Sequence, residues 1–123
     1  MIAIVAVVIT VLVMTSPPFS LRKHYEHYYL DQWCEDYDGK TEVIISAWSK
    51  CDCLTDSHAV EVSFADKWHE AIGKALHNGL QTGKEAGIVL IIEKQENYKY
   101  WTQLNTIIEY FELPIETWKI QNY

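Results

Sequence analysis

Positive charge is scarce in this chain. Ten Lys and Arg residues stand against 17 Asp and Glu residues, which gives a formal net charge of -7 at pH 7. Proteins that hold DNA or RNA over a broad area usually present a basic face, so this balance argues against such binding. It leaves room for a small basic patch beside an acidic metal site. Internal repeats are also absent from the sequence. Hydrophobic residues make up 49% of the chain, which excludes intrinsic disorder, and the length of 123 residues fits one domain.

The apolar N-terminal segment is too short to span a bilayer. Ile2 to Met14 is 13 residues long, whereas a spanning helix needs about 20. The length fits the core of a signal peptide, but no Lys or Arg precedes it and no clean cleavage site follows. Three interpretations stay open. The segment is a signal peptide that is cleaved on export to the periplasm or outside the cell, an uncleaved membrane anchor with a cytoplasmic domain, or the result of a wrongly assigned start codon. Each interpretation excludes residues 1–20 from the fold, and membrane contact would go only through them.

Three cysteines cannot all form pairs within one chain. If the segment around Cys51 and Cys53 is a strand, their side chains point to one face and Asp52 points to the other. We interpret the cysteines as small buried residues on the core side. A zinc site with Cys34 or His58 is an alternative, although the spacing matches no recognised ligand pattern.

Apolar periodicity divides residues 21–123 into helices and strands. Helices are predicted over 21–39, 65–83 and 97–113, and strands over 41–46, 50–54, 58–64, 87–92 and 115–120. The apolar stripe of the first predicted helix consists of Leu21, Tyr25, Tyr28, Tyr29 and Trp33, with Gly39 as its stop. The order α-β-β-β-α-β-α-β, with an uninterrupted apolar strand at 87–92, predicts an α/β (α+β) domain. Its mixed central sheet is flanked by helices.

Two acidic residues lie inside predicted strands, where such residues are uncommon. A two-residue turn at 56–57 places Asp52 directly opposite Glu61, on the same face and with Cβ atoms about 5 Å apart. Because two opposed carboxylates repel, a shared proton, Lys50 or a divalent cation must offset the cost. Mg²⁺ sites typically use one or two carboxylates. The alternative is a solvated sheet surface with a lysine nearby.

A polar stripe follows the second predicted helix, made of Lys67, Glu70, Lys74, His77 and Gln81. Glu70 and Lys74 have the spacing of an ordinary surface pair, and His77 and Gln81 are interpreted as surface residues. Lys67 differs, because it begins the helix directly after the strand that carries Glu61. Its side chain can lean back toward the two acids.

The order of elements, an Asp on the second strand and a Glu on the third resemble the PD-(D/E)XK nuclease superfamily. "TEVII" and "KCDCLTDSHAVEVSFADKWHEAIGKAL" are similar to a branch of small bacterial proteins in it. The resemblance covers about Lys23 to Ile120 and is densest from Glu42 to Ile91. It implies a restriction-endonuclease-like αβββαβ core with an extra C-terminal helix and strand. It also implies metal-dependent hydrolysis of phosphodiester bonds in nucleic acid.

The resemblance assigns roles residue by residue. It implies that Asp52 and Glu61 bind Mg²⁺ or Mn²⁺, and we expect a backbone carbonyl near Val62 to take part. Glu26 and Glu42 match acids that assist in some members, and Glu70 is a further accessory candidate.

Ser63 departs from the pattern, since the superfamily has a lysine at that position. We expect Lys67 to replace it, with Lys74 second and Lys50 third, by orienting a water molecule or screening the phosphate oxygens. If none of them does, the domain is a catalytically inactive interaction module, whose Tyr- and Trp-rich first helix could dock a partner. Residues 1–20 would associate such a module with the cell envelope.

Overall fold

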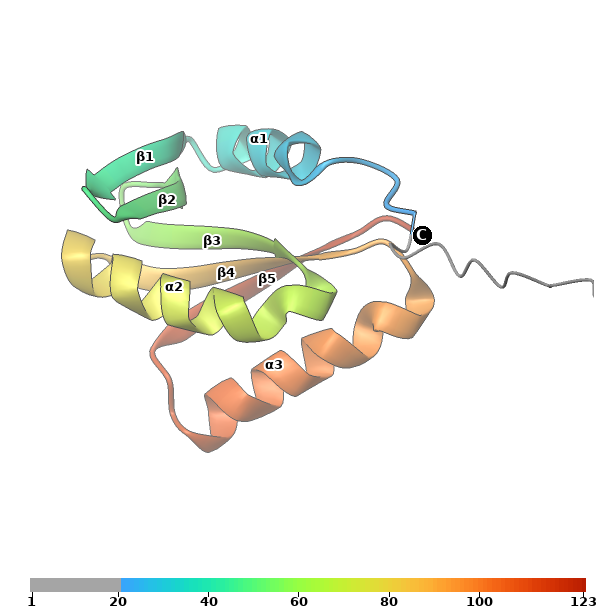
Figure 1. Cartoon of the computed structure of the whole chain (residues 1–123). Helices are drawn as coiled ribbons and strands as arrows, with labels where there is room; N and C mark the ends of the chain where they lie inside the picture. The colour runs from blue at the N-terminus through green and yellow to red at the C-terminus, as the bar shows by residue number, and fades with distance from the viewer. Residues whose placement is uncertain (1–20) are drawn as a thin grey trace, which may run out of the picture.

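The computed structural model describes residues 21–123, so the predictions for residues 1–20 lie outside the described part. Within residues 21–123, no helix is long and apolar enough to cross a membrane. The described residues form an α+β domain in which helices lie on both faces of one five-stranded mixed sheet (Figure 1). The predicted order of elements and the mixed sheet flanked by helices are confirmed.

The strands follow one another across the sheet in chain order, from β1 to β5. Their bounds are β1 Lys40–Ser46, β2 Ser49–Leu54, β3 His58–Phe64, β4 Glu85–Ile92 and β5 Ile115–Gln121. β1, β2 and β3 pair antiparallel, whereas β3, β4 and β5 pair parallel. Strand β3 is therefore where the sheet changes from antiparallel to parallel pairing.

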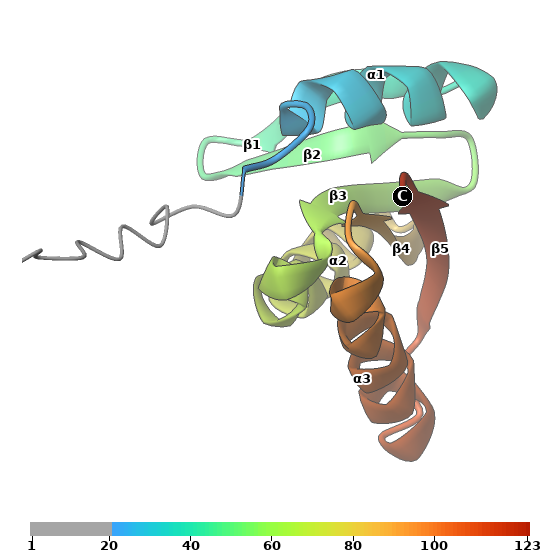
Figure 2. The same cartoon turned by 90° about the vertical axis from the view of Figure 1, so that its right-hand side faces the viewer.

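Three α-helices cover the sheet in the described part of the chain: α1 Glu26–Asp36, α2 Trp68–Thr82 and α3 Tyr98–Tyr110. Short 3-10 turns at Ala65–Lys67 and Gln95–Asn97 lead into α2 and α3. Parallel neighbours need crossover connections, and α2 and α3 supply them on one face of the sheet, while α1 lies on the other (Figure 2). Gly83, in the left-handed region at φ 68°, ends α2.

The core has two layers, one on each face of the sheet. Leu30 and Trp33 of α1 pack on Val89 from one side, and Ala75 of α2 packs with Ile88 on the other. Successive side chains of β4 thus alternate between two apolar layers. This explains why its sequence is an uninterrupted apolar run.

Helix α1 begins later than the sequence predicts. The backbone N–H groups of Lys23 and His24 donate to Glu93 Oε2, at 3.0 and 3.2 Å, which ties this segment across the end of β4. Leu21 and Tyr25 consequently lie outside the helix and are 80% and 89% exposed. The predicted stripe is wrong for these two residues and for Tyr28, which is also exposed; the buried stripe consists of Tyr29, Leu30, Trp33 and Cys34.

Two of the three cysteines form a disulfide, between Cys34 of α1 and Cys53 of β2. The disulfide was not predicted from the sequence, whereas the predicted burial of Cys51 and Cys53 is confirmed. Gly39 does not stop α1, which ends at Asp36. It passes directly over the disulfide instead, where a Cβ atom would lie 2.5 Å from Cys53 Sγ and 2.7 Å from Cys34 Sγ.

Candidate metal centre between two diverging strands

Strands β2 and β3 separate shortly after the turn that joins them. Their paired positions are Cys53 with Val60 and Leu54 with Ala59. The predicted register is therefore confirmed next to the turn. The paired ladder does not continue to Asp52 and Glu61, so the expected directly opposed pair is replaced by a gap between the strands.

The Asp52 carboxylate occupies one side of this gap. Its Oδ2 atom accepts a hydrogen bond of 2.9 Å from the backbone N–H of Val62, in place of a ladder carbonyl. Since the N–H and C=O groups of one strand residue point to the same edge, the Val62 carbonyl faces the gap as well. The carbonyl expected near Val62 thus lies beside the carboxylates.

Glu61 is buried on the other side of the gap, with an exposed fraction of 4%. Asn78 of α2 donates from Nδ2 to Glu61 Oε1 at 2.6 Å, and Ser49 Oγ donates to Asn78 Oδ1. A solvated sheet surface is therefore excluded for Glu61. Asn78 and Ser49 were not predicted as site residues, although an asparagine in the middle of a helix is a signal, because helix interiors disfavour it.

Burial and the charge of Asp52 raise the pKa of two acids at this centre, Glu61 and Glu26. Burial, followed by the charge of Asp52, raises the pKa of Glu61 to about 8, against a smaller lowering by the hydrogen bond from Asn78. Burial and Asp52 also raise the pKa of Glu26, while Lys67 and Lys74 act in the opposite direction. The metal-free centre thus carries an electrostatic cost that a bound cation would remove.

One small cavity of about 120 Å³ brings six predicted residues together: Glu26, Asp52, Glu61, Lys67, Glu70 and Lys74. Lys67 does lean toward the acids, as its place after β3 predicts. An adjoining cavity of about 490 Å³ shares Asp52, Glu61 and Lys74 and extends to Lys50 and Trp48. The two cavities connect the acidic centre to the hairpin between β1 and β2.

Glu42 does not line either cavity. It has a left-handed φ of 52°, and its carboxylate lies 3.2 Å from Lys50 Nζ and 3.4 Å from His27 Nε2. The structure therefore places Glu42 in an exposed group of charges beside the centre. Lys50, the third choice for the missing lysine, is paired there.

Neither protein-family models, curated proteins nor solved structures match this chain. The donor atoms of the centre indicate which ions it can bind. Two carboxylates and the Val62 carbonyl form an all-oxygen set, and hard ions such as Mg²⁺ and Mn²⁺ prefer oxygen ligands. The residues present fit the predicted cofactor.

Proposed function

We propose that this protein is a metal-dependent nuclease with a restriction-endonuclease-like core of the PD-(D/E)XK type. The observation that carries the proposal is the buried Glu61 carboxylate beside Asp52, in one cavity with Lys67 and Lys74. A chain that only needed a stable sheet would avoid this arrangement, because unpaired buried charge is destabilising.

Each residue has a defined task in the proposed reaction. Asp52, Glu61 and the Val62 carbonyl hold Mg²⁺ or Mn²⁺, which supplies Lewis acidity toward the phosphate and acidifies a water molecule. Lys67, at the first turn before α2, orients the attacking water and balances charge on the phosphate oxygens. Lys74 lines both cavities and contributes positive charge along the proposed path of the nucleic-acid phosphate backbone. Asn78 keeps the Glu61 carboxylate in place.

An exposed aromatic side chain beside the centre supports a nucleic-acid substrate. Trp48 is 95% exposed in the turn between β1 and β2 and lines the larger cavity together with Lys50 and His77. Unpaired bases stack on such rings, and basic side chains follow the phosphates. The net negative charge of the chain is consistent with a local contact of this kind, which neutralises few phosphates.

The disulfide supports export as the location of this activity. Disulfides form and persist in the periplasm and outside the cell and are rare in the cytosol. The link between Cys34 and Cys53 therefore favours a cleaved signal peptide over a cytoplasm-facing anchor. Mass spectrometry of the native protein would then show an N-terminus beyond Met14, whereas an intact Met1 in the membrane fraction would contradict export.

The decisive experiment is a cleavage assay with purified full-length protein on single- and double-stranded DNA and RNA. We expect cleavage with Mn²⁺ or Mg²⁺ and none with EDTA. Asp52→Asn and Glu61→Gln should abolish it while leaving the fold intact, as judged by circular dichroism. Asparagine is preferred to alanine at position 52 because its side-chain oxygen still accepts the hydrogen bond from Val62.

A matched control is Glu96→Gln, an exposed carboxylate ahead of α3, which should cleave like the wild type. If the wild type cleaves none of the substrates in either metal, the enzyme proposal fails. The protein would then be the catalytically inactive interaction module, and the replacement of the superfamily lysine by Ser63 would agree with that loss of activity.

A further inference from the structure

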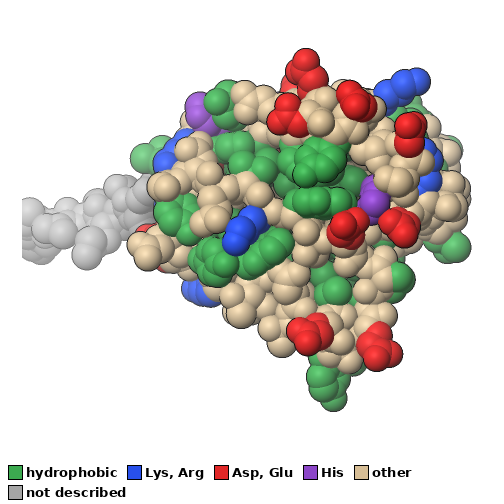
Figure 3. Space-filling model, turned by 180° about the vertical axis from the view of Figure 1, so that it is seen from behind, with side chains coloured by type: hydrophobic (Ala, Val, Ile, Leu, Met, Phe, Trp, Pro, Cys, Tyr) green, Lys and Arg blue, Asp and Glu red, His purple; other side chains and the backbone are tan. Residues whose placement is uncertain are grey.

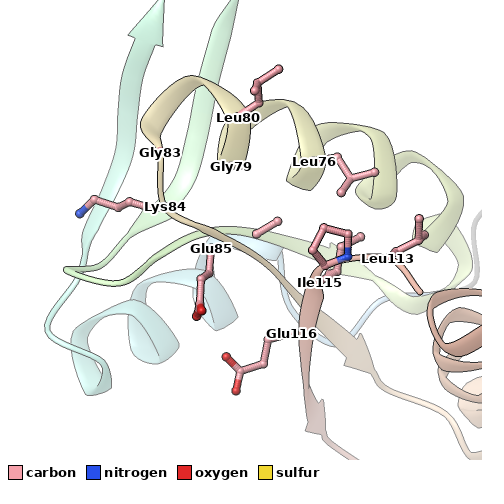
Figure 4. Close-up of a pocket in the computed structure, with 11 residues that line it drawn as sticks. Leu76, Gly79, Leu80, Gly83, Lys84, Glu85, Leu113, Ile115 and Glu116 are labelled. Carbon is pink, nitrogen blue, oxygen red and sulfur yellow. The ribbon is translucent and has the colours of Figure 1, made fainter. Parts of the chain in front are cut away.

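A second group of metal-ligating side chains lies away from the nuclease centre. His58 and Glu85 are the first residues of β3 and β4, and Glu116 is the second residue of β5; the three strands are parallel neighbours. One ligand atom from each lies within 4.8 Å of the others. Figure 4 shows Glu85 and Glu116 pointing from adjacent strands into the same space, on the side of the sheet away from α2.

The Nε2 atom of His58 is buried and has no hydrogen-bond partner among residues 21–123. Oxygen atoms of Glu85 and Glu116 lie 3.0 and 2.5 Å from it, yet neither is placed along the direction of a hydrogen bond. Around one ion at about 2.1 Å, tetrahedral ligand atoms lie roughly 3.4 Å apart. Both carboxylate oxygens lie closer to Nε2 than this separation, and both have room to move outward, since their side chains are 75% and 56% exposed.

The other side of the imidazole is already supported. Ser57 Oγ lies 2.6 Å from His58 Nδ1, so it can accept the Nδ1 proton and leave the lone pair on Nε2. Ligating histidines commonly have their second nitrogen fixed in this way. The ring of Trp118 packs edge-on at 5.3 Å between centroids and holds the plane of the imidazole.

The surroundings place the group at the margin of an aromatic surface. Trp33, Tyr37 and Trp118 pack against one another on the face of the sheet away from α2. Figure 3 shows hydrophobic side chains gathered on the face seen from behind, and a histidine with acidic side chains beside it. The His58 imidazole thus packs against apolar rings on one side. The two carboxylates face solvent on the other side, from which an ion can reach the three side chains.

We propose that His58, Glu85 and Glu116 form a second metal site, which binds a divalent transition ion of the zinc class. One imidazole nitrogen and two carboxylate oxygens suit Zn²⁺ better than Mg²⁺, which prefers oxygen ligands and retains its water molecules. Three protein ligands leave a fourth position to solvent. The ion joins the beginnings of three parallel strands, so it stabilises the sheet on the side away from the nuclease centre. This site does not depend on the proposed nuclease function.

The test is calorimetric titration of metal-free full-length protein with Zn²⁺, with visible absorption of the Co²⁺-loaded protein as a second measurement. We expect Glu116→Gln and His58→Gln to lose this site. Ser57→Ala should bind roughly tenfold more weakly, as after loss of an outer-shell partner. His69→Gln, an exposed histidine elsewhere, and Asp52→Asn should bind as the wild type does.

Glu116 has an exposed side chain, so its variant keeps the test informative if His58→Gln does not fold. Absence of Zn²⁺ binding in the wild type, or equal binding in Glu116→Gln and the wild type, would overturn the proposal. The group would then be an ion pair of a protonated histidine with two carboxylates. Loss of nuclease activity in Asp52→Asn with intact Zn²⁺ binding separates this result from the outcome of the cleavage assay.

Discussion

Strand β3 contributes one residue to each of two acidic groups, and the two groups differ in almost every physical respect. Glu61, in the middle of the strand, is buried and faces Asp52, with oxygen donors and lysines around it. His58, at the beginning of the strand, meets two largely exposed carboxylates. In the first group, two carboxylates repel each other, and a bound hard cation would offset that repulsion. The second group contains an imidazole nitrogen donor in addition to its two carboxylates. Burial and donor type, not the number of acids, determine what each group can bind.

The largest expected effect comes from crossing variants of the two groups. Asp52→Asn should lower kcat/KM for cleavage by about a thousandfold or more, because a catalytic metal supplies several kcal/mol of transition-state stabilisation. Glu116→Gln should leave cleavage close to the wild-type level. Measurement of cleavage and of Zn²⁺ binding on both variants checks this separation. If Glu116→Gln lost cleavage as severely, the two groups would act as one site.

Removal of the disulfide tests whether the antiparallel half of the sheet, β1 to β3, can be destabilised independently of the parallel half. Cys34→Ser should lower the free energy of unfolding by about 3 kcal/mol, the value for a closed loop of this size. The two cysteines are 19 residues apart and join α1 to β2. Urea denaturation measures the change, with Cys51→Ala as a matched control that keeps the disulfide. An effect of Cys34→Ser no larger than that of the control would show that packing alone holds α1 in place.

The lysines distinguish binding of the ion from activation of water. Lys67→Ala should lower kcat by about 100-fold, in the range for loss of one charge-stabilising donor, and should leave Mn²⁺ affinity unchanged. Lys74→Ala should have a smaller effect on kcat and raise KM. Single-turnover kinetics and Mn²⁺ titration resolve the two parameters. The reverse order of the two variants would assign the catalytic role to Lys74, about two turns further along the helix face.

A further expected effect is on the pH dependence of stability without metal. The pKa of Glu61 is raised from 4.5 to about 8 by burial and by Asp52, so the folded chain retains a proton that the unfolded chain releases. Its stabilising contribution is fully present below pH 4.5 and is lost as pH rises through about 8. Urea unfolding in EDTA should therefore show a decline toward alkaline pH that Glu61→Gln lacks. Equal slopes in both proteins would contradict the assigned burial cost.

Most of the fold could be predicted because its elements obey local rules. The strands at 58–64 and 87–92 and the helix closed by Gly83 follow from periodicity and end signals. The start of α1 could not be predicted, because contacts of Lys23 and His24 with Glu93 override a helical pattern. These contacts join residues about 70 positions apart in the sequence, beyond the reach of any local signal.

The candidate site was predictable in its residues but not in its geometry. Asp52 and Glu61 are visible as acids inside strands, and the turn fixes their register. The separation of β2 and β3 is not encoded in that register; it depends on Asp52 replacing a backbone acceptor for Val62. The group at His58, Glu85 and Glu116 was missed for a different reason: its members belong to three strands, and only the parallel pairing brings the beginnings of these strands together.

The buried thiol of Cys51 has a consequence for how the chain recovers from unfolding. It lies two positions from Cys53, and burial raises its pKa to about 11, so almost no thiolate is present near neutral pH. The native disulfide is therefore protected from exchange, which requires a thiolate. Once the chain unfolds, Cys51 regains ordinary acidity, and its thiolate can attack Cys34 Sγ. The Cys34–Cys53 bond then breaks, Cys53 leaves as a thiolate, and Cys34 is linked to Cys51. Heating in mildly alkaline buffer should therefore produce chains that no longer refold, whereas the same treatment at acidic pH should be reversible.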